Sequence, residues 1–167
     1  MPDEAADEVD RIVEAWSRER PDLDFSPLHV LSRVDRIAKQ LEKARADAFL
    51  ESGLAPWEFD VLAALRRAGP PYRLSPKSLL QQTLVTSGTM TNRIDRLHAR
   101  GLVERKDDPN DGRGVLVELS DSGRVKVDAV IAALIESEST LLAGLTPAER
   151  GRITDLLRKL SLGLDEA

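Results

Sequence analysis

Residues 75–119 read SPKSLLQQTLVTSGTMTNRIDRLHARGLVERKDDPNDGRGVLVEL, and this stretch decides the fold. Ser75 can cap the free N–H groups that begin a helix, and Pro76 suits the first helical position because no hydrogen bond is lost there. The apolar face of this short helix is supplied by Leu79, Leu80 and Leu84. The break at 83–87 is short enough for a turn. The pattern therefore predicts the first half of a helix-turn-helix.

A second helix is predicted over about residues 86–100. Its apolar residues recur at i, i+4 and i+7 and share one stripe: Met90, Ile94 and Leu97. The opposite face is small and polar: Thr91, Asn92 and Asp95. Because such a face suits a groove of DNA, this segment is predicted to be a DNA-reading helix.

A β-hairpin is predicted after the second helix. Gly101 can end that helix in a left-handed conformation, and two β-prone runs follow at 102–106 and 115–119. The loop between them, 107–114, contains Pro, Asn and two Gly and carries Arg113 at or near its tip. A basic side chain there is suited to the adjacent minor groove of DNA.

With these motifs in place, residues 26–163 resemble the winged-helix regulators of the MarR family. The likeness lies in SGTMTNRIDRLHARGLVER and in a D-x-R wing followed by V-x-L. It implies a mainly α, α+β winged-helix fold, an obligate dimer, a second helix in the major groove and a wing on the DNA backbone or minor groove. It also implies a single domain, with a DNA-binding lobe at 55–119 and dimerisation helices at 26–53 and 120–163.

The resemblance implies a set of DNA-contacting residues. The groove-facing side chains are expected to be Ser87, Thr89, Thr91, Asn92 and Arg96. Arg113 corresponds to the wing arginine, and Asp111 to the acidic residue that orients it. Arg105 is counted with this set, although the sequence leaves open whether Arg105 and Lys106 touch phosphate or only flank the wing.

Composition limits the alternatives. The chain has 167 residues, of which 32% are charged, so one domain without a membrane span is expected. The acidic start, 1–10, lacks the basic region of a signal peptide, which favours the cytoplasm. There is no cysteine, and His29 and His98 are expected to stand alone, so no metal and no cofactor is predicted. Nothing resembles a nucleophile with its base, so no catalytic residue and no enzyme is expected.

The net charge of −5 is unusual for a DNA-binding protein until it is divided along the chain. Residues 71–106 hold seven Lys or Arg against two Asp or Glu, whereas residues 1–24 hold three against nine. The local field governs docking on phosphate, so the basic segment is compatible with DNA binding.

The helices on either side of the lobe carry more apolar surface than a small lobe needs. The first, 26–53, has apolar residues at helical spacing: Leu28, Leu31, Val34, Ile37 and Leu41. In 120–163, Ser120 can cap one helix and Thr146 begins a capping box for another. This surplus predicts a homodimer that reads two half-sites of a pseudo-palindrome. The alternative is a monomer whose helices pack only on themselves.

An additional amphipathic helix is predicted at 4–20, with Val9, Ile12, Val13 and Trp16 on one face and Pro21 ending it. Such an extension resembles the urate-responsive branch of the family, in which an added first helix contributes a tryptophan to an effector pocket. The resemblance implies an effector-binding quartet: Trp16, Asp60, Arg67 and Arg93.

Arg93 connects the predicted pocket to the reading helix. It lies about 60° from Met90 on the helical wheel, at the edge of the buried stripe, and can point inward. Asp60 and Arg67 share one helix face, with Ala63 and Ala64 leaving space between them. Two arginines, a stacking tryptophan and an aspartate suit a planar anion such as urate.

Each residue of the quartet also has a plainer interpretation. Trp16 is compatible with a core position, Asp60 and Arg67 with a surface ion pair, and Arg93 with a phosphate contact. The chain is thus predicted to be a ligand-responsive regulator, a repressor in the first instance, released from its operator by a urate-like purine. The alternatives are release by a di- or tricarboxylate such as citrate or trans-aconitate, and a sequence-indifferent architectural DNA-binding protein.

Overall fold

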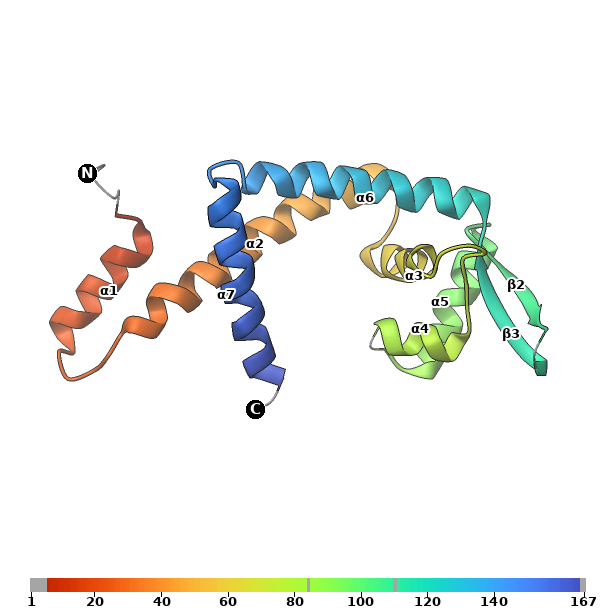
Figure 1. Cartoon of the computed structure of the whole chain (residues 1–167), viewed down its shortest axis with the longest axis horizontal. Helices are drawn as coiled ribbons and strands as arrows, with labels where there is room; N and C mark the ends of the chain where they lie inside the picture. The colour runs from red at the N-terminus through yellow and green to blue at the C-terminus, as the bar shows by residue number, and fades with distance from the viewer. Residues whose placement is uncertain (1–5, 84, 110, 166–167) are drawn as a thin grey trace. The chain divides into compact units, whose positions relative to one another are not determined.

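The computed structural model describes residues 6–83, 85–109 and 111–165, with the backbone alone at 112, 113 and 165 (Figure 1). The described chain is mostly helical, with a small antiparallel sheet. In chain order the elements are α1 (Glu8–Glu19), α2 (Ser26–Ser52), α3 (Pro56–Arg67), β1 (Arg73–Leu74), α4 (Pro76–Thr83), α5 (Ser87–Ala99), β2 (Val103–Asp108), β3 (Asp111–Leu119), α6 (Asp121–Leu141) and α7 (Pro147–Asp165). Residues 1–44 and 45–167 form two compact units.

The first unit begins with a capping box on α1. The Asp7 carboxylate accepts from the N–H groups of Val9 at 2.8 Å and Asp10 at 3.1 Å, and the Asp10 carboxylate accepts from the Asp7 N–H at 3.0 Å. The helix therefore starts at Glu8, and its predicted start is wrong for residues 6 and 7, while residues 4 and 5 lie outside the described part of the chain. Because Asp7 occupies the N-cap position, it cannot also be helical.

The second unit contains the predicted helix-turn-helix. The Ser75 hydroxyl accepts from the Ser78 N–H at 3.1 Å and caps α4. Thr86 caps α5 by accepting from the Thr89 N–H at 3.4 Å, and Gly101 follows α5 with a φ of +68°. The Ser75 cap and the left-handed Gly101 confirm the predictions from sequence. The helix predicted over about 86–100 is observed at Ser87–Ala99, because Thr86 and Arg100 are its capping residues. The predicted core role of Leu84 falls outside the described residues.

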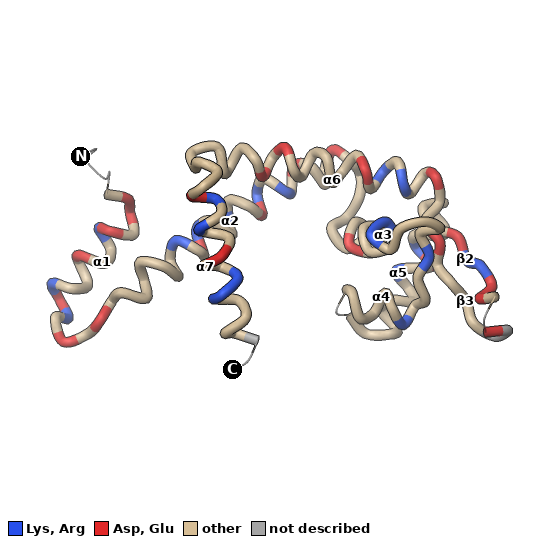
Figure 2. Tube along the Cα trace, viewed as in Figure 1, with Lys and Arg blue, Asp and Glu red and all other residues tan. Residues whose placement is uncertain are grey.

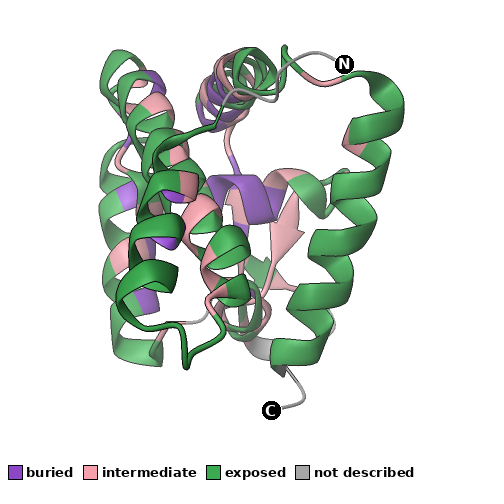
Figure 3. Cartoon of the chain, turned by 90° about the vertical axis from the view of Figure 1, so that its left-hand side faces the viewer, coloured by how far each residue is buried: buried purple, intermediate pink, exposed green. Residues whose placement is uncertain are grey.

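Helices α3, α4, α5 and α6 pack with the sheet around one core, and Figure 3 marks its buried residues. The largest fully buried side chains of this unit are Val61, Leu62, Leu65, Leu79, Met90, Leu97, Val103, Val117, Val127 and Val130. Met90 and Leu97, with Ile94 at 3% exposure, are the predicted stripe of α5. Burial of this stripe fixes which face of α5 is left for a partner.

The sheet has three strands in the order β1-β3-β2, and strand β1 was not predicted. Arg73 pairs with Glu118, and Leu74 with Val117, in antiparallel register. A two-residue strand has too little periodicity to be recognised in sequence, and only its pairing with β3 defines it. The Arg73 side chain also forms an ion pair with Glu118. β1 therefore fastens the start of the helix-turn-helix to the base of the wing.

The wing strands are longer than predicted. β2 continues to Asp108 and β3 starts at Asp111, so most of the predicted loop 107–114 is strand. A register shift lies between Asp107 and Asp108. A Cβ at Gly114 would lie 2.9 Å from the Cβ of Asp108, so glycine permits this close approach. The polar residues that predicted a loop lie instead at the narrow end of the β2–β3 hairpin.

The two C-terminal helices begin with the predicted caps. The Ser120 hydroxyl accepts from the Gly123 N–H at 3.0 Å and donates to the Gly101 carbonyl at 2.7 Å, which joins α6 to the end of α5. The Thr146 N–H donates to the Glu149 carboxylate at 2.7 Å, and the Glu149 N–H donates to the Thr146 hydroxyl at 3.3 Å. The helices proposed for dimerisation therefore exist at the predicted positions.

Candidate nucleic-acid interface and effector site

The exposed face of α5 presents the predicted groove residues. All five are exposed: Ser87, Thr89, Thr91, Asn92 and Arg96. The Thr91 hydroxyl donates to the Ser87 carbonyl at 3.2 Å, and Thr86 and Thr89 share a hydroxyl–hydroxyl bond of 2.9 Å. These local bonds orient the short side chains of the first helical turn. The face offers hydroxyl, amide and guanidinium groups, which are the donors and acceptors that read base edges and phosphates.

Two arginines of α5 lie over one tryptophan of α3. The guanidinium carbon of Arg93 is 5.4 Å from the ring centroid of Trp57, and that of Arg96 is 5.1 Å from the same centroid. An open hollow of about 450 Å³ is lined by Trp57, Gly88, Thr89, Asn92, Arg93 and Arg96. The structure therefore brings the predicted effector arginine, Arg93, together with groove residues.

Trp57 is a residue that the sequence reasoning missed. One signal was available: Arg93 and Arg96 are three residues apart on a helix and so share a side. Nothing in the helical period of 56–67 indicates that an indole on α3 meets residues more than thirty positions later. Only the packing of α3 against the lobe supplies that partner.

The predicted effector residues Asp60 and Arg67 are both exposed on α3. Within the described part of the chain, neither has an ion-pair or hydrogen-bond partner. The neighbouring Arg66 instead pairs with Asp128 at 2.8 Å. The expected space beside Ala63 and Ala64 is wrong, because both alanines are buried in the core at 7% and 0% exposure. Any ligand of this pair must therefore lie over the helix surface.

Trp16, the fourth predicted effector residue, belongs to the first unit. It is 51% exposed and stacks on Phe25 with a centroid distance of 6.0 Å and an interplanar angle of 23°. Its exposure argues against the plainer interpretation of a core tryptophan. An indole face left open in this way is available for a planar ligand or a partner surface.

Two basic residues of the wing, Arg105 and Lys106, pair with acidic side chains, and Figure 2 shows basic and acidic positions along β2. Arg105, predicted to contact DNA, forms an ion pair with Asp95 of α5. Lys106 pairs with Glu104 at 2.5 Å, which raises the pKa of the lysine and lowers that of the glutamate. Residue 113 lies within β3, and its side chain is outside the described atoms, so the wing role of Arg113 stays a prediction. The orienting role of Asp111 stays one as well.

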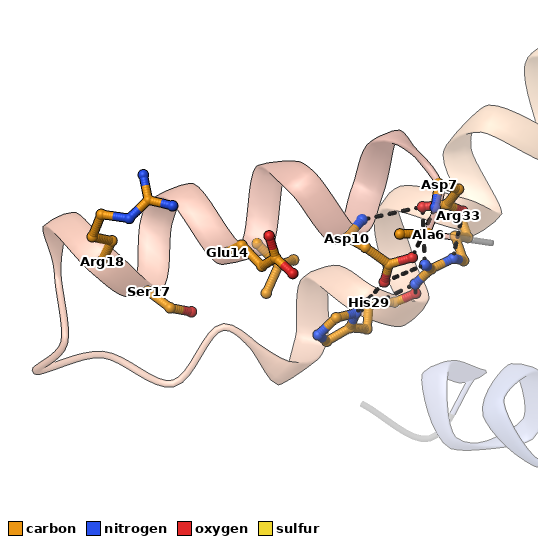
Figure 4. A pocket seen from close by; sticks show the side chains of 9 residues that line it. Ala6, Asp7, Asp10, Glu14, Ser17, Arg18, His29 and Arg33 are labelled. Atoms are coloured by element: carbon orange, nitrogen blue, oxygen red, sulfur yellow. Dashed lines mark hydrogen bonds and ion pairs between the residues drawn. The ribbon is translucent and has the colours of Figure 1, made fainter. Parts of the chain in front are cut away.

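A second hollow, of about 990 Å³, lies within the first unit between α1 and the start of α2 (Figure 4). Arg33 lies at one end of it and donates to Asp7 at 2.9 Å and to Asp10 at 2.7 Å. These bonds are the largest cause that lowers the pKa of both aspartates. Nδ1 of His29 lies 3.5 Å from the Asp10 carboxylate, so the expectation of an isolated His29 is wrong. Its acidic neighbour sits on α1, which sequence spacing did not reveal.

His98, on α5, is the second histidine expected to stand alone. It is exposed, but its Nδ1 lies 3.1 Å from the Val103 carbonyl. This contact ties the end of α5 to the beginning of β2. His98 is therefore exposed to solvent and also has a local backbone partner.

Metal binding and membrane insertion are two alternatives to a nucleic-acid interface. No group of three or more potential metal-binding side chains is found among the described residues. None of the described helices combines the length and the apolar character needed to cross a bilayer.

A helix-turn-helix, a β-hairpin wing and a polar exposed face on the second helix define a winged-helix DNA-binding regulator. A sequence model of the MarR family matches residues 52–114. The chain is 33% identical to the transcriptional regulator PecS of Dickeya dadantii, covering 92% of each chain. It is 32% identical to the repressor NicR of Pseudomonas putida, covering 83% of this chain and 88% of NicR. The chain belongs to the MarR family.

Solved structures agree with the fold. BpsR of Bordetella bronchiseptica, whose DNA binding is regulated by 6-hydroxynicotinic acid, is 32% identical with a TM-score of 0.65, covering 83% of this chain and 96% of that one. Sco3205 of Streptomyces coelicolor, solved in complex with DNA, has a TM-score of 0.70 at 22% identity, covering 85% and 93%. The mainly α winged-helix fold predicted from sequence is confirmed. Members of the family are transcriptional regulators, which is a class apart from enzymes.

Proposed function

We propose that this chain is a ligand-responsive repressor that binds a pseudo-palindromic operator as a homodimer. The observation that carries the proposal is the face of α5, where five predicted groove residues are exposed opposite a buried apolar stripe. A single reading helix binds DNA with modest affinity. Two such helices related by a two-fold axis bind more tightly and recognise a palindromic sequence.

Support for the dimer comes from apolar residues that each unit leaves exposed. On α2 these are Val30, Leu31, Val34 and Ile37, and on α7 they are Ile153, Leu156, Leu157 and Leu160. Exposed apolar surface of this extent is typical of a protein–protein interface. Sedimentation of the free protein tests this part of the proposal, and a monomer at micromolar concentration would contradict it.

We propose a small planar anion as the effector, with urate favoured. Arg67 and Asp60 are exposed without partners among the described residues, and Trp16 presents an open indole face. BpsR, a relative at 32% identity, responds to 6-hydroxynicotinic acid, which is also a planar nitrogen heterocycle and an anion. This likeness in ligand chemistry supports a flat heterocycle over the alternative, a flexible carboxylate such as citrate or trans-aconitate.

The proposed mechanism is a population shift. An effector held by Asp60, Arg67 and Arg93 would bias α5 away from the position that fits DNA. The ligand can shift the equilibrium only by its differential affinity for the two states, typically about 1–3 kcal/mol of coupling. A response of roughly 5-fold to 150-fold in operator affinity is therefore expected at saturating effector.

The test begins with an operator selected from random duplexes by the protein itself. Fluorescence anisotropy then measures release of this DNA by urate, 6-hydroxynicotinate, citrate and trans-aconitate in parallel. Arg67→Ala and Asp60→Asn are expected to keep operator affinity and lose release by the active ligand, whereas Arg152→Ala, at an exposed position of α7, should retain both and serves as the control. If the affinities for all duplexes agreed within threefold, the protein would instead be an architectural DNA-binding protein.

A further inference from the structure

Arg93 and Arg96 of α5 share the indole of Trp57, with their guanidinium carbons 5.4 Å and 5.1 Å from the ring centroid. Trp57 is half-buried and packs against the hydrophobic core, so its ring has a fixed position at the start of α3. The two arginines are one turn apart on the helix. Both therefore take their orientation from one aromatic side chain that belongs to another element.

These two arginines differ in their partners from many other arginines of the chain. Carboxylates pair with Arg33, Arg45, Arg66, Arg73, Arg100 and Arg105. Within the described residues, no carboxylate forms an ion pair with Arg93 or Arg96. The negative face of an indole attracts a guanidinium without neutralising its charge. The edge N–H donors of both arginines stay available for a phosphate, a base or an anionic ligand.

We propose that Trp57 is a positioning residue that holds Arg93 and Arg96 as a pair and transmits effector binding at Arg93 to DNA contact at Arg96. This inference rests on the proposed function. Without effector, the shared ring offsets the repulsion between two adjacent cations and keeps both beside the hollow that includes Thr89 and Asn92. An anion that draws Arg93 off the ring removes one of the two cations and changes the position that Arg96 prefers.

Fluorination of one ring tests this pair directly. In the Trp16→Phe variant Trp57 is the sole tryptophan, so a biosynthetically incorporated tetrafluorotryptophan changes this side chain alone. Fluorine withdraws density from the ring face while nearly preserving its shape. Loss of two cation–π contacts should weaken operator binding about fivefold to thirtyfold. Unchanged affinity, with the protein folded by circular dichroism, would overturn the proposal.

A double-mutant cycle separates positioning from a structural role. In an Arg96→Ala background, fluorination should change the logarithm of the operator affinity by less than half as much as it does when Arg96 is present. The reason is that one of the two cations is gone. An equal effect in both backgrounds would show that Trp57 acts by another route and would overturn the proposal. Trp57→Phe should bind within about threefold of wild type, and Trp57→Leu should match the fluorinated protein. Loss of binding in Trp57→Phe at unchanged thermal stability would contradict the assignment.

Effector release gives the second readout. Trp57→Leu, which keeps Trp16, should release DNA with a smaller ratio of affinities, with and without urate, than Trp57→Phe, and an equal ratio would refute transmission through Trp57. The proposed function is tested separately, by measuring whether the unfluorinated wild-type protein binds its operator specifically. Absence of that binding refutes the function, whereas normal binding with no fluorination effect refutes only the role of Trp57.

Discussion

The guanidinium of Arg100, at the C-terminal end of the reading helix, donates to the carboxylate of Glu58, whose side chain is 6% exposed. Glu58 also accepts from the Ala55 N–H at 2.9 Å, and Arg100 donates to the Gly53 carbonyl at 3.0 Å. This relationship fixes the end of α5 to the junction between α2 and α3. It also satisfies the buried carboxylate, which would otherwise be costly.

Arg100→Ala is expected to lower the free energy of unfolding by about 2 kcal/mol. Removal of one partner of a buried pair usually costs more, but Arg100 is 39% exposed and water can replace part of its contact. Urea denaturation measures the loss. The matched control is Arg158→Ala, which breaks an exposed pair with Asp155 and should cost less than about 0.5 kcal/mol. Equal losses in the two variants would contradict the assignment of Glu58 as a buried anchor point.

Two glycine substitutions should act in opposite directions. A Cβ at Gly123 would lie 2.1 Å from the Leu102 carbonyl oxygen, so Gly123→Ala must push α6 away from the start of the wing and should destabilise the protein by about 1–3 kcal/mol. Gly151 lies within α7 with nothing near its missing Cβ, and Gly151→Ala should stabilise by about 0.5–1 kcal/mol. Thermal unfolding decides the signs, and a stable Gly123→Ala protein would show that α6 does not sit this close.

The ion pair between Asp95 and Arg105 restrains a predicted DNA contact. Asp95→Asn removes a negative charge from the reading helix and frees the arginine, so binding to every duplex should tighten. The slope of log affinity against log salt should steepen by about one. Arg105→Ala should weaken binding uniformly and reduce the slope by about one. Asn92→Ala is the contrasting variant, since loss of a base contact should reduce sequence discrimination more than total affinity.

Acid should loosen the attachment of α1 to α2. The Arg33 guanidinium holds the pKa values of Asp7 and Asp10 below the ordinary value of 3.8. Because the pKa values are lowered in the folded state, the ion pairs stabilise the folded protein at any pH above the ordinary pKa. This stabilisation is lost as the pH falls through the folded-state pKa. In Trp57→Phe the sole tryptophan is Trp16 of α1, so its emission should be constant above about pH 5 and change below about pH 4.

Arg33→Ala provides the control for this titration. Without the guanidinium the two carboxylates return toward their ordinary pKa, so the emission change should weaken or move to higher pH. Lys39→Ala removes an exposed partner of Asp35 on the same helix and should leave the titration unchanged. A transition at the same pH in Trp57→Phe with and without Arg33→Ala would show that this ion pair does not hold α1.

The helix-turn-helix was predictable because its signals are local. Ser75, Thr86 and Gly101 mark helix ends by contacts with residues within a few positions, and Met90, Ile94 and Leu97 mark the buried face by period alone. The wing was predicted in place but not in length. Its polar residues near 107–114 are common in loops, and only the pairing of β2 with β3 shows that most of them are strand.

The candidate site was predictable in part. The sequence selected Arg93 as unusual among the residues of α5, on the basis of its angle from the buried stripe. It did not supply the aromatic partner of Arg93, because Trp57 and α5 meet only through the packing of α3 into the lobe. The spacing of Asp60 and Arg67 was correct for one helix face, but the burial of Ala63 and Ala64 between them depends on what packs there.

The sequence by itself determined the class of protein, the caps and the faces of the helices, since these follow from spacing along a single element. The tertiary structure decided which residues from different elements meet: Trp57 with Arg93 and Arg96, Glu58 with Arg100, and Asp95 with Arg105. Contacts of this kind depend on the close packing of a core, which no local period encodes.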